Sequence, residues 1–246
     1  MSVSPLPTAD LLVLLYHHVG TVLPGRGIYG QWVTPGQLHR ELCYLRSAGH
    51  TFVDAAWVLE HFPDRLGEVP SPTLVTFDDG LGNLHGRALP VLQALEVPAL
   101  VFVVAGQIGG RTVWEPRPGH RGHRVLDWAQ ICEMQAGGVT FGSHTLTHPH
   151  LTQLPAEQVR EELESSRRIL EEGLERPVET LAYPYGDFSE ETARQAEAAG
   201  YRLAFSTVLG TNGAAADPLA LRRVNIRRHA TLSHFRGKLA RAARAD

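Results

Sequence analysis

The chain has few cysteines and no long hydrophobic run, and each shortage excludes a class of protein. Its two cysteines, Cys43 and Cys132, form no CxxC pair. Both lie in apolar helical patterns, where a free cysteine behaves as a small buried hydrophobe, so we assign them no ligand. The longest apolar run, residues 99–105, covers seven residues, whereas a membrane-spanning helix needs roughly 20. No membrane span is expected.

The N-terminus also lacks the marks of a secretory signal. Residues 1–10 contain no basic residue, and the apolar run at residues 11–16 is too short for a signal core and precedes no small-residue cleavage site. The sequence as given therefore predicts a cytoplasmic protein. Processing or truncation of a longer chain would allow an extracellular or cell-envelope location.

Negative charge is scarce near the C-terminus. The net charge is −3, but residues 221–246 contain seven arginines, one lysine and one aspartate, a net charge of +7 that leaves −10 for residues 1–220. Such runs are mostly solvated faces, and without interleaved aromatic residues we expect no nucleic-acid partner. An anionic polymer substrate is a better interpretation. Nothing in the sequence specifies an oligomeric state.

What the chain does contain is a long alternation of β-rich apolar runs and helical patterns. Its 246 residues, 43% of them apolar and 20% charged, suffice for one large core. The alternation is typical of parallel strands joined by crossover helices. No repeat or linker interrupts it, so we predict an α/β fold with a single domain over residues 1–246. Seven strands favour a barrel over an open sheet, at residues 11–16, 73–77, 99–104, 139–143, 180–183, 203–206 and 224–227.

Four predicted helices have clear ends. The first follows the cap Thr34 and ends at Gly49, and the others span residues 155–173, 189–200 and 232–243. Asp127 opens a further helix through a predicted capping box with Gln130, which makes Asp127 structural and its neighbour Trp128 a core or groove-wall residue. The long irregular stretch at 105–124 is a candidate wall of a substrate groove.

Two adjacent carboxylates, Asp78 and Asp79, follow a strand apolar enough to be buried. For Asp-Asp-Gly alone, a turn or a helix cap is the better interpretation. A second cluster changes this, because His144 and His148 have the i, i+4 spacing that one helical turn would aim at a common point. That pair alone is equally well explained by surface histidines. With one aspartate it makes three metal ligands and an open position for water, and the other aspartate is left as a base.

Further polar residues follow other predicted strands, at the end of a barrel where catalytic groups gather. They are His17 and His18, the turn Tyr183-Pro184-Tyr185-Gly186, and His229. Each is weak alone, since a single histidine is usually a satisfied polar residue and Tyr-Pro-Tyr-Gly is usually a turn. In total, five strand ends converge on one expected site.

These residues resemble the polysaccharide deacetylase family, also called the NodB-homology or carbohydrate esterase 4 family. Thr-Phe-Asp-Asp-Gly followed by Ser-His-Thr-x-x-His in that order is specific, and the Ala-Tyr-Pro-Tyr-Gly form is similar to the branch of the poly-N-acetylglucosamine deacetylases. The resemblance implies a distorted (β/α)7 barrel. It covers most of the chain, at residues 12–19, 34–38, 76–80, 143–148, 181–186 and 221–224.

The resemblance also implies roles for single residues. Asp79, His144 and His148 would hold a divalent metal, usually Zn²⁺, and Asp78 would be the general base. The metal would lower the pKa of its bound water toward about 7, and the hydroxide would attack an acetyl carbonyl. The backbone N–H of Tyr185 would stabilise the oxyanion.

The implied function is metal-dependent removal of N-acetyl groups from amino-sugar oligomers or polysaccharides. One alternative is a hydrolase on the same scaffold that acts on an O-acetyl ester or on a small amide. A second is a carbohydrate-binding homologue without turnover, although binding alone has no use for a free base such as Asp78.

The sequence departs from the family pattern in the groups around the base. Ala182 stands where the family has an arginine that orients the base, so Asp78 needs another partner, Arg223 or Arg227, or does without one. The late Asp-Trp motif is absent, since Asp127 comes too early.

The general acid is the second departure. The family's Leu-x-His motif matches His234 by its letters and His229 by its position at a strand end, and we prefer His229, with absence of the acid as a further alternative. His17 is either structural or oriented toward the metal ligands or substrate. His150 is expected to be exposed, and no partner is predicted for a remaining set of histidines: His18, His120 and His123.

Overall fold

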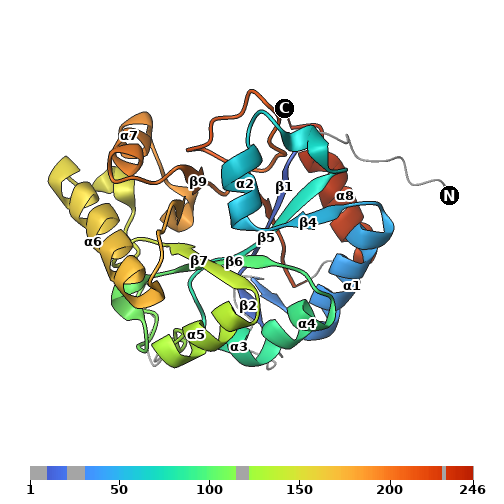
Figure 1. The fold of residues 1–246 in the computed structure, drawn as a ribbon, viewed down its shortest axis with the longest axis horizontal. Helices are drawn as coiled ribbons and strands as arrows, with labels where there is room; N and C mark the ends of the chain where they lie inside the picture. Colours follow the sequence, from blue (N-terminus) through green and yellow to red (C-terminus); the bar gives the residue numbers. More distant parts are fainter. Residues whose placement is uncertain (1–9, 21–30, 115–121, 229–230, 246) are drawn as a thin grey trace.

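The computed structural model describes residues 10–20, 31–114, 122–228 and 231–245. Its strands are β1 (Leu12–Tyr16), β2 (His18–Val19), β3 (Trp32–Val33), β4 (Thr51–Val53), β5 (Pro72–Phe77), β6 (Ala99–Val103), β7 (Val139–Ser143), β8 (Thr180–Ala182), β9 (Leu203–Phe205) and β10 (Val224–Asn225). A parallel sheet in the order β10-β1-β5-β6-β7-β8-β9 curls at the centre, with helices around it (Figure 1). β2 and β3 form a separate two-stranded sheet.

The curled sheet closes on itself through the segment that enters β10. Leu221 makes a parallel bridge to Phe205 in β9, and Val224 is in register with Leu14 in β1. The predicted distorted barrel is therefore confirmed, and all seven predicted strands are present with ends shifted by at most two residues.

The strand β4 was not predicted, and it accounts for part of the distortion. It pairs with the first half of β5, from Thr51 opposite Pro72 to Val53 opposite Leu74. β6 pairs with the second half of β5, where Thr76 lies opposite Leu100. Two strands thus share one edge of β5. The sequence offers only Phe52 and Val53 as apolar residues in this strand, and Asp54 ends the run.

The helices surround the sheet. They are α1 (Pro35–Ser47), α2 (Ala55–His61), α3 (Asn83–Arg87), α4 (Leu89–Ala94), α5 (Trp128–Ala136), α6 (Ala156–Leu174), α7 (Glu190–Ala198) and α8 (Leu232–Ala242), with short 3-10 turns η1 (Leu66–Glu68), η2 (Ala105–Gln107), η3 (Leu151–Gln153) and η4 (Pro184–Gly186). The four helices predicted with clear ends are α1, α6, α7 and α8. The capping box is also confirmed, because Asp127 Oδ1 accepts a 2.9 Å hydrogen bond from Gln130 N.

The end of α6 lies within one residue of the predicted end at Gly173. The helix continues to Leu174, and Glu175 is the residue in the left-handed region, with a φ of 54°. Gly173 lies instead against the indole of Trp128, so close that a Cβ would be 2.1 Å from a ring atom. Glycine is needed there for packing, and Trp128 is a contact between α5 and α6.

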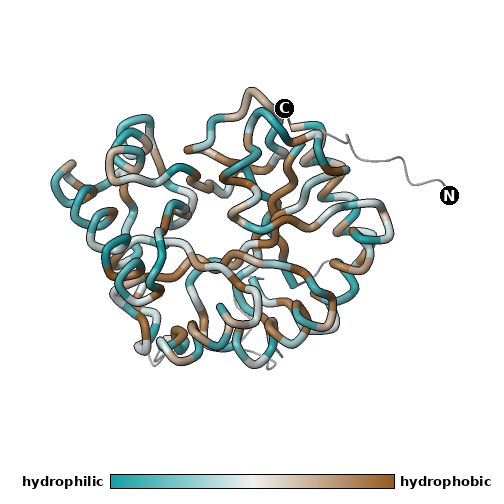
Figure 2. Tube along the Cα trace, viewed as in Figure 1, coloured by the Kyte–Doolittle hydropathy of each residue, from teal (hydrophilic) through white to brown (hydrophobic). Residues whose placement is uncertain are grey.

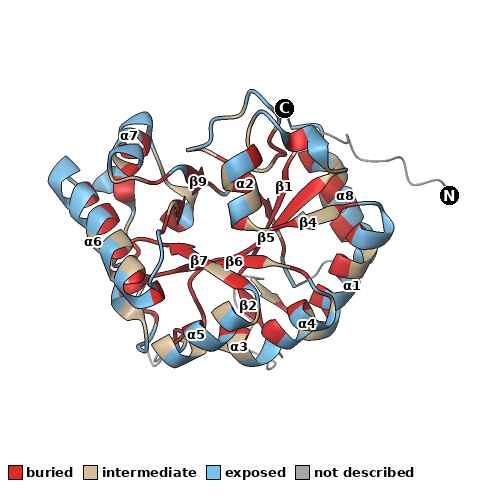
Figure 3. Ribbon diagram, in the orientation of Figure 1, coloured by how far each residue is buried: buried red, intermediate tan, exposed pale blue. Residues whose placement is uncertain are grey.

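Both faces of the sheet are buried, as expected for parallel strands covered by helices. Figure 3 shows buried strands and helices whose outer sides are exposed, and Figure 2 shows the apolar strands at the centre. Successive side chains of one strand face opposite sides of the sheet. Leu14 packs in the cluster shared with the helices, whereas Val13, Phe102 and Phe205 belong to a second apolar cluster that fills the barrel.

The two cysteines are not buried as expected. Cys43 is half-buried on α1 and Cys132 is exposed on α5, because both helices direct other residues, such as Leu42 and Ile131, into the core. Within the described ranges, the helices are all too short or too polar to cross a bilayer.

Candidate metal centre and active site

The three predicted metal ligands meet at the carboxyl ends of the strands. Asp79 follows β5, and His144 and His148 follow β7. Asp79 Oδ1 lies 3.7 Å from His144 Nε2 and 3.5 Å from His148 Nε2. All three side chains are buried, and one ligand atom from each lies within 4.8 Å of the others. Among the described residues, this is the group of His, Cys, Asp and Glu side chains with metal-binding geometry.

These separations fit a metal ion better than a set of hydrogen bonds. Good N–H···O bonds are shorter, at about 2.9–3.0 Å. Two ligands that each lie about 2.1 Å from a tetrahedral cation are about 3.4 Å apart, close to the values found here. Burial lowers the pKa of His144 to about 4, so its imidazole is neutral at pH 7. A neutral imidazole is the form that binds metals.

The two imidazoles are oriented by different means. His144 Nδ1 lies 2.7 Å from the carbonyl oxygen of Ala182, a bond that leaves Nε2 for a metal. His148 Nδ1 is buried and has no hydrogen-bond partner among the described residues. Its ring is instead held by packing, because it stacks on Trp114 at 4.5 Å and 17° and meets the Tyr185 ring edge-on at 4.6 Å.

The loop that carries both histidines is not the helical turn that was predicted. Residues 144–148 lie in no helix, and Thr145 and His148 have left-handed φ values of 65° and 67°. Glu162 on α6 clamps the loop: its Oε2 accepts 2.9 Å bonds from Leu146 N and Thr147 N, and its Oε1 accepts from the Thr147 hydroxyl. The two histidines thus lie together as predicted, but the clamped loop brings them together and not a turn of helix.

The sequence analysis did not identify Glu162. An acidic residue on the buried side of a predicted helix is the signal that could have identified it. Replacing it with alanine leaves two backbone N–H groups of the ligand loop without their acceptor. We expect Glu162→Ala to lower the free energy of unfolding by about 3 kcal/mol and to weaken zinc binding about 10- to 100-fold, measured by urea unfolding and by competition with a chelating dye. Glu164→Ala, an exposed change on the same helix, is the control, and equal zinc affinity in both variants would contradict the clamp.

Asp78, beside the metal group, pairs with a buried arginine. Arg223 Nη1 and Nη2 donate to its two carboxylate oxygens at 2.7 Å each. Arg223 has no exposed surface, its Nε donates to the carbonyl oxygen of Ser206 at 2.7 Å, and its guanidinium carbon lies 5.7 Å from the Phe102 ring centre. Of the two partners considered for Asp78, the structure therefore places Arg223 there. Ala182 instead accepts a hydrogen bond from His144 through its carbonyl oxygen, and the cation beside Asp78 comes from the segment that enters β10.

Charges keep both aspartates ionised. Burial raises the pKa of Asp78, but the Arg223 guanidinium outweighs that effect and leaves the pKa of Asp78 below its usual value. Burial likewise raises the pKa of Asp79, and the imidazoles of His148 and His17 outweigh it, so the pKa of Asp79 also lies below its usual range. The Asp78 carboxylate is thus paired with the Arg223 guanidinium, and the Asp79 carboxylate faces imidazoles.

Aromatic rings line the same end of the barrel. Tyr185 is 46% exposed and has a left-handed φ of 62°. Its ring stacks on His150 at 3.9 Å, and His150 Nδ1 lies 3.3 Å from Asp187 Oδ2. His150 is exposed, as expected. Trp114, from the irregular stretch predicted to wall a groove, completes this aromatic set through its contact with His148.

The other predicted histidines differ in their placement. His229, the preferred general acid, and His120 lie outside the described residues. His234 is exposed at the start of α8, where its Nδ1 lies 2.8 Å from the Thr231 hydroxyl. His17 is buried after β1, with its Nε2 3.4 Å from Gln31 Nε2.

His18, for which no partner was predicted, has two aromatic neighbours. It stacks on Trp32 at 4.1 Å and meets His123 edge-on at 4.4 Å.

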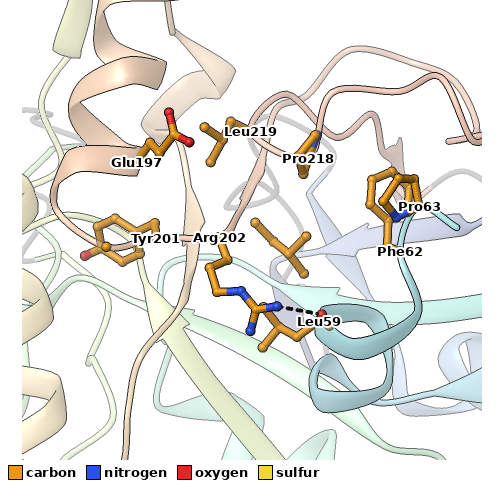
Figure 4. Close-up of a pocket in the computed structure, with 10 residues that line it drawn as sticks. Leu59, Phe62, Pro63, Glu197, Tyr201, Arg202, Pro218 and Leu219 are labelled. Atoms are coloured by element: carbon orange, nitrogen blue, oxygen red, sulfur yellow. Dashed lines mark hydrogen bonds between the residues drawn. The ribbon is translucent and has the colours of Figure 1, made fainter.

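An open pocket of about 340 Å³ lies at the opposite end of the barrel (Figure 4). Its walls include Phe62 after α2, Arg202 before β9, and Leu219. The Arg202 guanidinium donates to the carbonyl oxygen of Leu59 at 2.9 Å. The pocket adjoins the amino end of β9, so it is separate from the carboxylate and histidine groups.

Fold and site together define an α/β-barrel protein with a candidate metal centre at the carboxyl ends of its strands. A family model described as "Polysaccharide deacetylase" matches residues 69–204, more than half of the chain. This chain belongs to the polysaccharide deacetylase family. The matched region contains Asp78, Asp79, His144 and His148.

Known proteins show the same relationship. "Putative polysaccharide deacetylase YxkH" of Bacillus subtilis is 30% identical over 153 residues, which are 62% of this chain and 50% of that protein. "Poly-beta-1,6-N-acetyl-D-glucosamine N-deacetylase" of Staphylococcus aureus is 21% identical over 184 residues, 71% of this chain and 60% of that protein. The chain thus spans about half to three fifths of the length of these relatives.

A solved structure shows the same fold over the whole barrel. The Streptococcus pyogenes deacetylase PplD, solved in complex with acetate, superposes with a TM-score of 0.82 at 23% identity. The superposition covers 95% of this chain and 99% of PplD.

Proposed function

We propose that this protein is a metal-dependent hydrolase that removes N-acetyl groups from amino-sugar oligomers or polysaccharides. The observation that carries the proposal is the grouping of Asp79, His144 and His148 next to Asp78, a carboxylate that lies outside this ligand set and is held by Arg223. The family match supports it, and the S. aureus relative carries the name of an N-deacetylase of an amino-sugar polymer.

The cation that best suits the three side chains is Zn²⁺, because two imidazoles and one carboxylate are a common zinc set with room for a further ligand. A bound divalent cation would lower the pKa of a water molecule and polarise the acetyl carbonyl. The protein's own part is to present three ligands in a fixed arrangement. Ala182 and Glu162 do this through the hydrogen bonds that orient His144 and its loop.

Asp78 is the proposed general base. It stays ionised because Arg223 faces it, and each carboxylate oxygen keeps acceptor capacity beyond its single bond to the guanidinium. The bidentate pair also fixes the direction of the carboxylate. Asp78 would take a proton from the attacking water, and the backbone N–H of Tyr185 would stabilise the developing oxyanion.

The departing amine needs a proton. His229 is the proposed donor because it comes soon after β10 (Val224–Asn225) in the sequence. His234 is the alternative, and its position as an exposed residue beside Thr231 favours a structural role at the start of α8.

Acetate release tests the proposal directly. Purified protein supplied with zinc should release acetate from N-acetylglucosamine oligomers and should lose this activity when a chelator removes the metal. Faster release from acetylated xylan would favour an O-acetyl esterase, and release from small acetamides alone would favour a small-molecule amidase. Binding of the oligomers without acetate release under the same conditions would favour a carbohydrate-binding protein.

A further inference from the structure

The helix α8 and the residues on either side of it carry a cluster of positive charges that the proposed reaction does not use. We call it the basic face and define it by six residues: Arg227, Arg228, Arg236, Lys238, Arg241 and Arg244. Five of them are exposed, and Lys238 is half-buried. The helix has no acidic residue. The neighbouring α1 has one, Glu41, which is buried and accepts a 2.9 Å hydrogen bond from the Tyr16 hydroxyl.

Exposed arginines on α6 and α7, by contrast, lie beside acidic residues. On α6, Arg160 pairs with Glu157 and Arg168 lies 3.7 Å from Glu172. On α7, the Arg194 guanidinium lies 2.6 Å from Glu191. Over the described ranges, no residue of the basic face forms such an ion pair. Burial, followed by the positive charges of Arg227 and Arg241, lowers the pKa of Lys238, as expected for like charges held together.

We propose that the basic face binds a polyanionic glycan, a sugar polymer that carries carboxylate or phosphate groups. Charge complementarity is the first argument, because clustered exposed cations attract a chain of regularly spaced anions. Position is the second: Arg227 and Arg228 follow β10 at its carboxyl end, the end of the barrel that holds Asp78 and His144. A polymer on this face would reach that end of the barrel at Arg227 and Arg228. Figure 1 shows α8 beside β1 and α1.

Two other polyanions fit this face less well. Insertion into an anionic membrane needs several exposed apolar side chains next to the cations. The helix α8 exposes Leu232, whereas Phe235 and Leu239 are buried. Nucleic acids without fixed sequence are commonly held by base stacking on aromatic rings. Tyr44, the ring beside α8, is covered by Arg236 at 5.7 Å and by the edge of Phe235 at 6.1 Å.

The test measures binding of fluorescently labelled polygalacturonate, with neutral dextran as the uncharged control. We expect polygalacturonate to bind, dextran not to bind, and the affinity to fall roughly 10- to 100-fold between about 50 and 200 mM salt. The triple variant Arg236→Gln, Arg241→Gln, Arg244→Gln should bind at least about tenfold more weakly and reduce the salt slope by about half, because it removes three of the six cations.

The chain offers a control with the same change in net charge. Arg160→Gln, Arg168→Gln, Arg194→Gln removes three exposed arginines from α6 and α7, and it should bind polygalacturonate like the parent. Equal binding by the two triple variants would overturn the proposal. Tighter binding of duplex DNA or of phosphatidylglycerol vesicles than of polygalacturonate would replace it with a nucleic-acid or a membrane surface.

This binding does not depend on the proposed deacetylase activity, which acts at another place. Both triple variants should release acetate from neutral N-acetylglucosamine oligomers at the parent rate. A protein that binds polygalacturonate and releases no acetate would therefore contradict the proposed function alone, and the reverse result would contradict the glycan surface alone.

Discussion

Replacing Asp78 with asparagine is expected to stop acetate release while the metal stays bound. The substitution removes the proposed base and leaves the three candidate ligands unchanged. General-base catalysis contributes typically 10²- to 10⁴-fold, so we expect kcat to fall by at least about 10³-fold. Metal content measured by elemental analysis should equal that of the parent protein.

The same substitution has a predicted cost in stability. A neutral amide in place of the carboxylate would leave the buried Arg223 cation without a compensating charge, and breaking a buried ion pair costs about 3–5 kcal/mol. Because the pKa of Asp78 lies below its usual value, the pair stabilises the fold above the unfolded-state pKa, and this contribution is lost as the pH falls through the lower folded-state pKa. Urea unfolding of Asp78→Asn should therefore show a large loss at neutral pH that shrinks in acid.

Asp127→Asn is the control for both measurements. Asp127 is a carboxylate that caps α5 and does not belong to the metal group, and asparagine is an equally good cap. A rate for Asp78→Asn within tenfold of the parent, at full metal content, would remove Asp78 from the role of base.

Removing His144 is expected to remove the metal. Even residues that only orient a ligand change metal affinity 10- to 100-fold, so loss of one of three protein ligands should weaken zinc binding by more than about 100-fold. His144→Ala should then retain far less than one zinc per chain after dialysis, and so should His148→Ala. Far-ultraviolet circular dichroism of each variant reports whether the barrel remains folded.

His85→Ala provides the matched control. His85 is a histidine on α3 whose Nε2 pairs with Glu133 at 2.6 Å on the surface, and its replacement should leave the zinc content unchanged. Folded His144→Ala that retains one zinc per chain would contradict the assignment of the metal group.

The loop that carries His144 and His148 presents its ligands without regular secondary structure. Aromatic rings around the metal group and the clamp from α6 hold the ligands in place. Glu162 accepts hydrogen bonds from the backbone N–H groups of residues 146 and 147, which lie in no helix or strand. Gly106 lies so close to the loop that a Cβ there would be 2.6 Å from the Leu146 carbonyl oxygen. The loop is thus fixed from two sides, and this leaves His148 to be oriented by ring packing.

The sequence by itself determined the secondary structure of the barrel and the chemical types of its site. Apolar runs and helix caps are local patterns, so seven strands of the main sheet and the helices α1, α6, α7 and α8 were predictable. The meeting of Asp79, His144 and His148 was also predictable, because each follows a strand and parallel strands bring their carboxyl ends together.

Only the tertiary structure decided which distant side chains meet. Arg223 is 145 residues from Asp78 in the chain, and their contact exists because closure of the barrel brings Arg223 to the strand that ends at Asp78. Glu162 reaches its loop because α6 packs against β7. Such contacts depend on which elements become neighbours. Local periodicity specifies the type of an element and its buried face, but not the residue that lies opposite it.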